Sequence, residues 1–231
     1  MVMLSCPHPC PDEPPMKIVT IISQKGGSGK TTLAVHLATA AAKAGHATAI
    51  IDLDPQGTAA SWGDRRTADG PEVISGHAIR LAALIDAARA NGADFLVLDT
   101  APNADQTASL AARAADVVLI PCRAAAFDLE AIETTLLLTK AASKPAYVVL
   151  NAVPPRSGIG DEAAAGLAGQ GAQVAPYRLT QRAPFAHGVI DGRTAQEFEP
   201  QGKAAAEIQT LYKWVCGVVD MSTRGQARKA A

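Results

Sequence analysis

Short apolar runs alternate along this chain with longer, alanine-rich segments of helical periodicity. The apolar runs are continuous in Val, Ile and Leu, which is typical of strands that are covered on both faces. We expect strands at Lys17–Ser23, Ala47–Asp52, Phe95–Asp99, Val117–Pro121 and Ala146–Asn151, with further candidates at Glu72–Ile74 and near Gln173–Tyr177. We expect helices at Lys30–Ala44, Ala78–Ala90, Asp105–Arg113, Phe127–Ala142 and Ala204–Val219, with a further candidate at Gln181–Asp191. This alternation predicts an α/β fold, a mostly parallel twisted sheet with helices on both faces.

The composition agrees with one domain. The chain has 231 residues, of which 48% are hydrophobic and 19% charged, enough to bury a large core. Residues 1–15 are rich in proline and have nothing to pack on, so we expect a disordered extension there. The domain then covers 16–221, and 222–231 form a small, basic, flexible tail. No apolar run reaches the length of a membrane span.

The cysteines point to a reducing compartment. Cys6 and Cys10 flank His8 in a way that resembles a metal cluster, but their proline-rich surroundings favour a disordered tail. Cys122 and Cys216 stand alone, and no framework of paired cysteines is present. Since the N-terminus also lacks the apolar core of a signal peptide, we expect a cytoplasmic protein.

A glycine-rich turn, Lys25-Gly26-Gly27-Ser28-Gly29-Lys30-Thr31-Thr32, follows the first strand and opens the first helix. Glycines let backbone N–H groups turn inward toward phosphate oxygens, and a helix N-terminus adds partial positive charge. In this arrangement Lys30 is placed for the β- and γ-phosphates and the Thr31 hydroxyl for Mg²⁺. The usual pattern G-x-x-x-x-G-K-[ST] is not met strictly, because Gln24 occupies the first glycine position and Lys25 adds a second lysine.

The stretch KGGSGKTT resembles the deviant Walker A motif of the ParA/MinD group of P-loop ATPases. The resemblance runs from about Met16 to Val219 and is closest to the small, Soj-type ParA form, which has no helix-turn-helix domain before the P-loop. It implies a slow, partner-stimulated hydrolase that binds ATP and Mg²⁺. It also implies that Lys25 reaches across a homodimer to the partner's phosphates, so that two monomers sandwich two ATP molecules.

Two further strand ends carry carboxylates. Asp52-Leu53-Asp54-Pro55-Gln56 is similar to the family motif DxDPQ, in which the second acid, here Asp54, orients the attacking water. Asp52 then supports the loop by hydrogen bonding, and a helix N-cap is the alternative role for Asp54. Asp99 ends an apolar strand in the Walker B pattern and should hold Mg²⁺ through a water near Thr31. Thr100-Ala101-Pro102 resembles the switch II turn.

The base site is expected at the last strand. Asn151 ends the strand at Val148–Asn151, where a residue in the family reads the adenine edge; the alternative is turn initiation before Pro154. Pro176 begins a segment, 176–182, that resembles the one closing over the base.

The formal net charge is −1, so any affinity for DNA has to come from a local patch. From Arg178 onward, eight Lys or Arg stand against five acids. The candidate DNA contacts are Arg182, Arg193, Lys203 and Lys213. Some of them can instead pair with Glu197, Glu199 or Glu207. Phosphate contacts alone would give sequence-independent binding.

The resemblance leaves several uses of the ATPase open. A ParA-type protein binds DNA nonspecifically, associates with the nucleoid and, with a ParB-like or cargo adaptor protein, segregates or positions plasmids, chromosomes or protein cargo. A MinD-type membrane helix is not indicated, because the tail at 223–231 has no apolar face to insert. A bridged iron–sulfur cluster is not indicated either, since no second cysteine precedes Cys122 between Thr32 and Pro121. The remaining alternative is a nucleotide-gated switch that docks a protein without DNA.

Overall fold

The computed structural model describes residues 15–125 and 132–221. The strands are β1 (Lys17–Ile21), β2 (Thr48–Asp52), β3 (Glu72–Ser75), β4 (Phe95–Asp99), β5 (Val117–Arg123) and β6 (Ala146–Asn151). The helices are α1 (Lys30–Lys43), α2 (Thr58–Asp64), α3 (Leu81–Ala90), α4 (Asp105–Ala114), α6 (Ile132–Ala142), α7 (Ile159–Gly169), α8 (Ala183–Ile190), α9 (Ala195–Phe198) and α10 (Lys203–Val218), with a short 3-10 helix, η1 (Ala78–Arg80).

The strands form one six-stranded sheet in the order β3-β2-β4-β1-β5-β6. Every pairing within it is parallel. The order reverses around β1, which lies between β4 and β5, and ligands of open α/β sheets bind at such a reversal, beyond the carboxyl ends of the strands. The register places Asp99 opposite both Ile21 at the end of β1 and Asp52 at the end of β2. Three of the segments expected to carry chemistry therefore meet at one edge.

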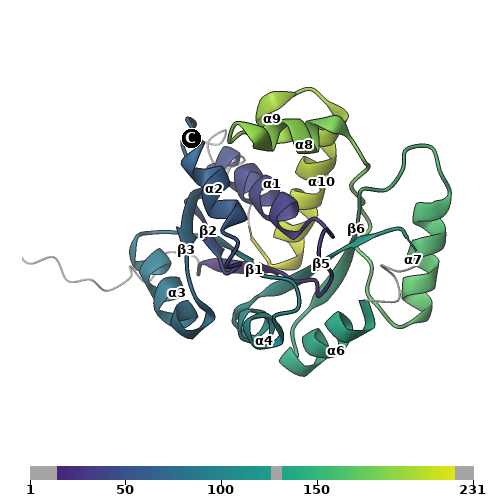
Figure 1. Ribbon diagram of the computed structural model, residues 1–231, viewed down its shortest axis with the longest axis horizontal. Coiled ribbons are helices and arrows are strands. Elements are labelled where there is room, and N and C mark those ends of the chain that lie inside the picture. The colour runs from purple at the N-terminus through teal and green to yellow at the C-terminus, as the bar shows by residue number, and fades with distance from the viewer. Residues whose placement is uncertain (1–14, 126–131, 222–231) are drawn as a thin grey trace, which may run out of the picture.

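Helices cover both faces of the sheet (Figure 1), with α1, α2, α8, α9 and α10 on one side and α3, α4 and α6 on the other. Alternate residues of a strand point to opposite faces, so Phe95 and Val97 pack with α1 and α10 while Leu96 and Leu98 pack with α3. This two-sided burial is why the strands read as continuous apolar runs. The α/β fold with a parallel sheet expected from the sequence is confirmed.

The expected strand near Gln173–Tyr177 is wrong. This segment meets β6 only at an isolated bridge between Val148 and Val174. Ala175 donates its N–H to the Val148 carbonyl at 2.8 Å. The next residue, Pro176, has no N–H, so it cannot continue the hydrogen bonding of a strand.

Among the described residues, helices α2, α7 and α9 were not predicted from the sequence. Helix α7 contains several glycines, which lower helix propensity, and it is stabilised by burial of Ala163 and Leu167 one turn apart. The candidate helix at Gln181–Asp191 is confirmed as α8. The helix expected at Phe127–Ala142 is confirmed over α6, and its first residues lie outside the described part of the chain.

The expectations for 1–15 and 222–231 fall almost wholly outside the described residues. Within 15–125 and 132–221, no helix combines the length and the apolar character that crossing a membrane requires.

Candidate functional site

The glycine-rich turn between β1 and α1 has the backbone of an anion-binding loop. Gly27 and Gly29 have φ of 72° and 95°, the left-handed region where a side chain would be strained. A Cβ on Gly29 would also lie 2.1 Å from Asn151 Nδ2. Helix α1 begins with no side-chain cap and no acid in its first turn. Its first N–H groups are therefore free to bind an anion.

Lys30 is the buried cation of this loop. Its side chain donates to the Lys25 carbonyl at 3.2 Å, and the residue is only 6% exposed. Burial lowers the pKa of Lys30, and the carboxylates of Asp99 and Asp54 oppose this shift. A buried ammonium group beside the turn is placed to bind a phosphate strongly.

Asp99 is the buried anion of the same edge. It is completely buried, and neither of its oxygens has a hydrogen-bond partner among the described residues. Burial raises its pKa to about 7; the Thr31 side chain opposes this, and Asp52 adds to it. A buried carboxylate without a partner costs free energy unless a cation reaches it.

The residues present fit Mg²⁺. This ion takes one or two carboxylates or hydroxyls from a protein and completes its shell with phosphates and water. Asp99 offers two unpartnered oxygens, and Thr31 stands at the start of α1 beside it. In the described ranges no group of three or more His, Cys, Asp or Glu could hold a metal by itself. The site therefore suits an ion that arrives with a phosphate.

Asp52 supports the loop that carries Asp54, as expected. Its Oδ1 accepts from the Asp54 N–H at 3.0 Å, and its Oδ2 accepts from the Ala60 N–H in α2 at 3.0 Å. Asp54 is half-buried and accepts from the Gln56 N–H at 2.9 Å. The N-cap of α2 is Gly57, so the alternative role for Asp54 as a helix cap is wrong. The Thr100 hydroxyl donates to the Ile21 carbonyl at 2.9 Å and so attaches the turn that follows β4 to the end of β1.

Asn151 lies against the glycine-rich turn. Its Nδ2 donates to the Ser28 carbonyl at 2.8 Å, and its Oδ1 accepts from the Ala152 N–H at 2.9 Å. Each atom keeps capacity for one further hydrogen bond. A cavity of about 350 Å³ opens beside it, with Gly29 and Thr32 of the turn on one side and a wall from 180 to 189 on the other. Its size suits a base and ribose.

The segment 176–182, expected to close over the base, supplies three residues of this wall, whereas Arg123 and the residues from α8 were not expected at the site. The cavity is lined by Arg123 at the end of β5 and by Thr180, Gln181, Arg182 and Phe185, whereas Pro176 is exposed and is not among its lining residues. Arg123 pairs in register with Asn151, so its position at the end of an expected strand was a signal for it. Phe185 comes from α8, and no local pattern indicates that this helix lies beside the glycine-rich turn.

Lys25 borders a second cavity, of about 530 Å³. Gln24, Gly26, Asn103, Asp105 and Thr134 complete its lining. The two lysines of the motif thus have different surroundings, since Lys30 is buried and Lys25 is half-buried.

The four candidate DNA contacts fall into two pairs. Arg182 pairs with Glu207 at 2.7 Å and Arg193 with Asp191 at 2.6 Å. Lys203 and Lys213 are exposed on α10, and neither belongs to an ion pair in the described residues. Both arginines therefore have their charge balanced locally.

Residues 19–175 match the model of the CobQ/CobB/MinD/ParA nucleotide binding domain. The chain is 33% identical over 217 residues to the maintenance of carboxysome distribution protein A of Gloeobacter kilaueensis, covering 90% of this chain and 96% of that protein. It is 31% identical over 144 residues to the chromosome-partitioning ATPase Soj of Thermus thermophilus, covering 49% of this chain and 57% of that protein.

Solved structures share the fold. The MinD cell division protein of Aquifex aeolicus superposes with a TM-score of 0.71 at 17% identity, covering 87% of this chain and 97% of that one. The ATP complex of Cyanothece McdA(D38A) superposes with a TM-score of 0.68 at 16% identity, covering 90% of this chain and 97% of that one.

Proposed function

Because the chain belongs to the CobQ/CobB/MinD/ParA family of nucleotide-binding domains, we propose that it is a Mg²⁺-dependent ATPase of the ParA type. The observation that carries this proposal is the pair of buried, opposite charges at the phosphate-binding turn. Lys30 is desolvated beside a turn that is open to an anion, and the Asp99 oxygens are unpartnered at the same edge. Together they suit a metal-bound phosphate chain.

The roles of the residues follow from their positions. Backbone N–H groups from Gly26 to Thr32 bind the phosphates, and Lys30 stabilises charge on the β- and γ-phosphates. Thr31 and Asp99 hold Mg²⁺, which would neutralise charge on the phosphates. Asp54 orients the attacking water, and the two bonds from Asp52 fix the loop that carries it. Asn151 contacts the base in the cavity beside Gly29, together with the segment that follows Pro176.

We infer that ATP binding creates a homodimer. Lys25 borders a second cavity, distinct from the one beside Asn151, and the resemblance to the deviant Walker A motif supports a role for this lysine at a partner's phosphates. Asp54→Ala should bind ATP and accumulate as a dimer, because only the carboxylate that orients water is lost, with hydrolysis reduced on the order of a hundredfold. Lys25→Ala should bind ATP and stay monomeric. Size-exclusion chromatography with light scattering measures both. If the wild type and Asp54→Ala both remain monomeric with ATP, the sandwich dimer is wrong.

We propose further that the ATP dimer binds DNA without sequence preference and positions a cargo on the nucleoid through an adaptor protein. A relative that aligns over nearly its full length is named for carboxysome distribution, which favours protein cargo over plasmid or chromosome. Lys203 and Lys213 are the exposed candidates for DNA contact, and dimerisation would double their number on one assembly.

The DNA proposal is tested by a shift assay on random duplex at low salt, with ATP, with ADP and without nucleotide. Binding should appear only with ATP and should weaken equally on all sequences in Lys203→Ala/Lys213→Ala. The matched control is Lys43→Ala/Lys140→Ala, which removes two exposed lysines from α1 and α6. No binding in any nucleotide state would instead favour the second candidate, a MinD-like switch that docks a protein. The local pairing of Arg182 and Arg193 favours this alternative.

A further inference from the structure

The wall of the cavity beside the phosphate-binding turn is not part of the sheet. It consists of a loop, Thr180–Arg182, and the side of α8 that carries Phe185, Ala186 and Val189. The loop runs beside the end of β6, where Gln181 donates its N–H to the Val153 carbonyl at 2.8 Å. The opposite side of the cavity belongs to α1 and its turn. The distance between the two sides therefore depends on contacts made outside the cavity.

Glu207 of α10 fixes the loop end of the wall with four hydrogen bonds. The backbone N–H and the hydroxyl of Thr180 each donate to its carboxylate at 2.9 Å. Arg182 donates from Nε at 3.0 Å and from Nη2 at 2.7 Å. Glu207 is not itself a lining residue. One carboxylate thus holds both the backbone and the side chains of the wall.

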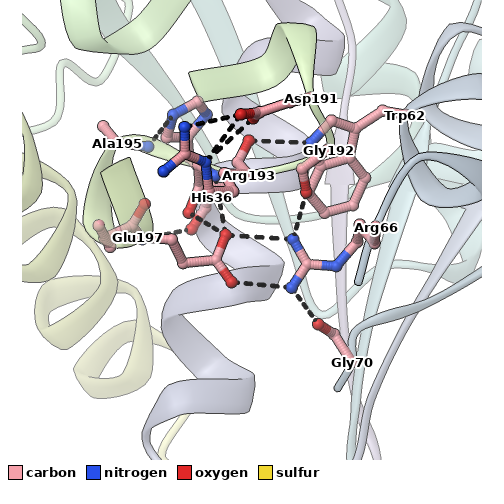
Figure 2. Close-up of polar contacts among 11 residues, drawn as sticks. His36, Trp62, Arg66, Gly70, Asp191, Gly192, Arg193, Ala195 and Glu197 are labelled. Carbon is pink, nitrogen blue, oxygen red and sulfur yellow. Dashed lines mark hydrogen bonds and ion pairs between the residues drawn. The ribbon is translucent and has the colours of Figure 1, made fainter. Parts of the chain in front are cut away.

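His36 of α1 fixes the helical end of the wall. Its Nδ1 donates to the Thr32 carbonyl at 2.7 Å, and its Nε2 accepts from the Ala195 N–H at 3.0 Å. Its ring packs edge-on against Phe185, with centroids 5.2 Å apart. Figure 2 shows His36 beside the backbone of Ala195. The imidazole is fully buried, and burial lowers its pKa to about 4, so the neutral ring that these two bonds need is present at pH 7.

A second layer keeps this end in place. Gln196 donates to the His36 carbonyl at 2.8 Å, and Glu197 closes a capping box on Thr194 at the start of α9. Arg66 then binds both oxygens of Glu197, at 2.9 and 3.1 Å (Figure 2). The residues that meet His36 are therefore rigidly held, and movement of the ring would move the wall with respect to Thr32.

We propose that Glu207 and His36 are positioning residues that set the width of the base pocket. The inference rests on the proposed function, since it requires the cavity at Asn151 to take the base and ribose of the nucleotide. Neither side chain lines the cavity; Glu207 bonds to the wall, and His36 bonds to the carbonyl of Thr32 rather than to an N–H group of the turn. Loosening the wall should therefore weaken contacts to the base and leave contacts to the phosphates intact.

The test compares two ligands on the full-length protein by calorimetry with Mg²⁺ present: ATP, and inorganic tripolyphosphate, which has no base. Glu207→Ala and His36→Gln should each weaken ATP binding about tenfold, as expected for losing well-formed hydrogen bonds. Tripolyphosphate affinity should stay within about twofold. Glu207→Gln keeps an acceptor for Thr180 or Arg182 and should recover part of the ATP affinity.

Matched controls separate positioning from general destabilisation. Asp86→Ala breaks an ion pair with Arg89 of similar length, 2.8 Å, within α3, none of whose residues line the cavity. His46→Gln replaces another buried histidine, which pairs with Asp94. Both should leave the two affinities unchanged, with thermal unfolding confirming that every variant is folded.

Equal weakening of ATP and tripolyphosphate, or no change in either, in a folded Glu207 or His36 variant would overturn the inference. A wild-type protein that binds neither ligand would instead overturn the proposed function on which it rests.

Discussion

The molecule has two buried sites that each combine a positive and a negative side chain. At one, Arg66 and Glu197 join the end of α2 to α9; at the other, Lys30 at the start of α1 interacts electrostatically with Asp99 at the end of β4. Arg66 donates to Gly192, to Gly70 and to both oxygens of Glu197, as Figure 2 shows, and only its Nε lacks a partner. Asp99 has a partner on neither oxygen within the described residues.

The pKa values express this difference. Burial alone would raise the pKa of Glu197, but hydrogen bonds from Arg66 and Thr194 outweigh it and the pKa lies below its usual value. For Asp99 burial prevails and the pKa rises to about 7. The buried charge of Glu197 is paired within the protein, where it contributes to the fold. The buried charge of Asp99 lacks such partners and is open to a ligand.

The largest expected effect is on nucleotide binding at the open site. Lys30→Ala removes the buried ammonium that faces the phosphates and should lower ATP affinity at least about a hundredfold. Because burial already disfavours the charged lysine, the fold should persist. Calorimetry together with circular dichroism measures both. Near-normal ATP affinity in a folded Lys30→Ala variant would show that this turn is not a phosphate-binding loop.

At the satisfied site the expected effect is on stability. Arg66→Ala leaves Glu197 largely buried without its cation and should lower the free energy of unfolding by about 3 kcal/mol. Urea denaturation measures this. The matched control is Arg89→Ala, which breaks an exposed pair with Asp86 and should change the free energy by less than about 1 kcal/mol. Similar losses for the two variants would contradict the comparison.

The effect of pH should distinguish the two sites. The pKa of Asp99 is raised on folding, so the folded state binds a proton more tightly and its stability falls as pH rises from about 4 to about 7. Asp99→Asn removes this dependence. Without nucleotide, the variant should be more stable than the wild type, by about 1–2 kcal/mol at pH 8 and by less at pH 5. Urea unfolding at the two pH values decides it, and an equal or reversed difference would show that Asp99 is satisfied.

The smallest effect is expected from the N-terminal segment. Both charged sites lie within 16–221, so a chain that begins at Met16 should keep ATPase activity within about twofold of full length. The residues removed lie outside the described part of the chain except for Pro15. A large loss of activity, or zinc bound through Cys6 and Cys10 in the full-length protein, would contradict this prediction.

Much of the site could be predicted from the sequence because its residues follow strands directly. A parallel sheet brings its carboxyl strand ends to one edge, so Lys30, Asp52, Asp54, Asp99 and Asn151 converge once the strands are recognised. The glycines of the turn and the acids after apolar runs are local signals. They predicted the class of fold, which is confirmed, and the phosphate-binding loop, which stays a prediction, without any tertiary information.

Only the tertiary structure decided which charges are available. In the sequence, nothing distinguishes Arg182 and Arg193 from Lys203 and Lys213 as candidate DNA contacts. In the structure, the charges of the two arginines are balanced by Glu207 and Asp191. His36 contacts Phe185 of the wall and Gln196 of α9, and the second of these contacts joins residues 160 positions apart. Burial and hydrogen-bond partnership come from such distant contacts, and these determine whether a charged side chain stabilises the fold or remains open to a ligand.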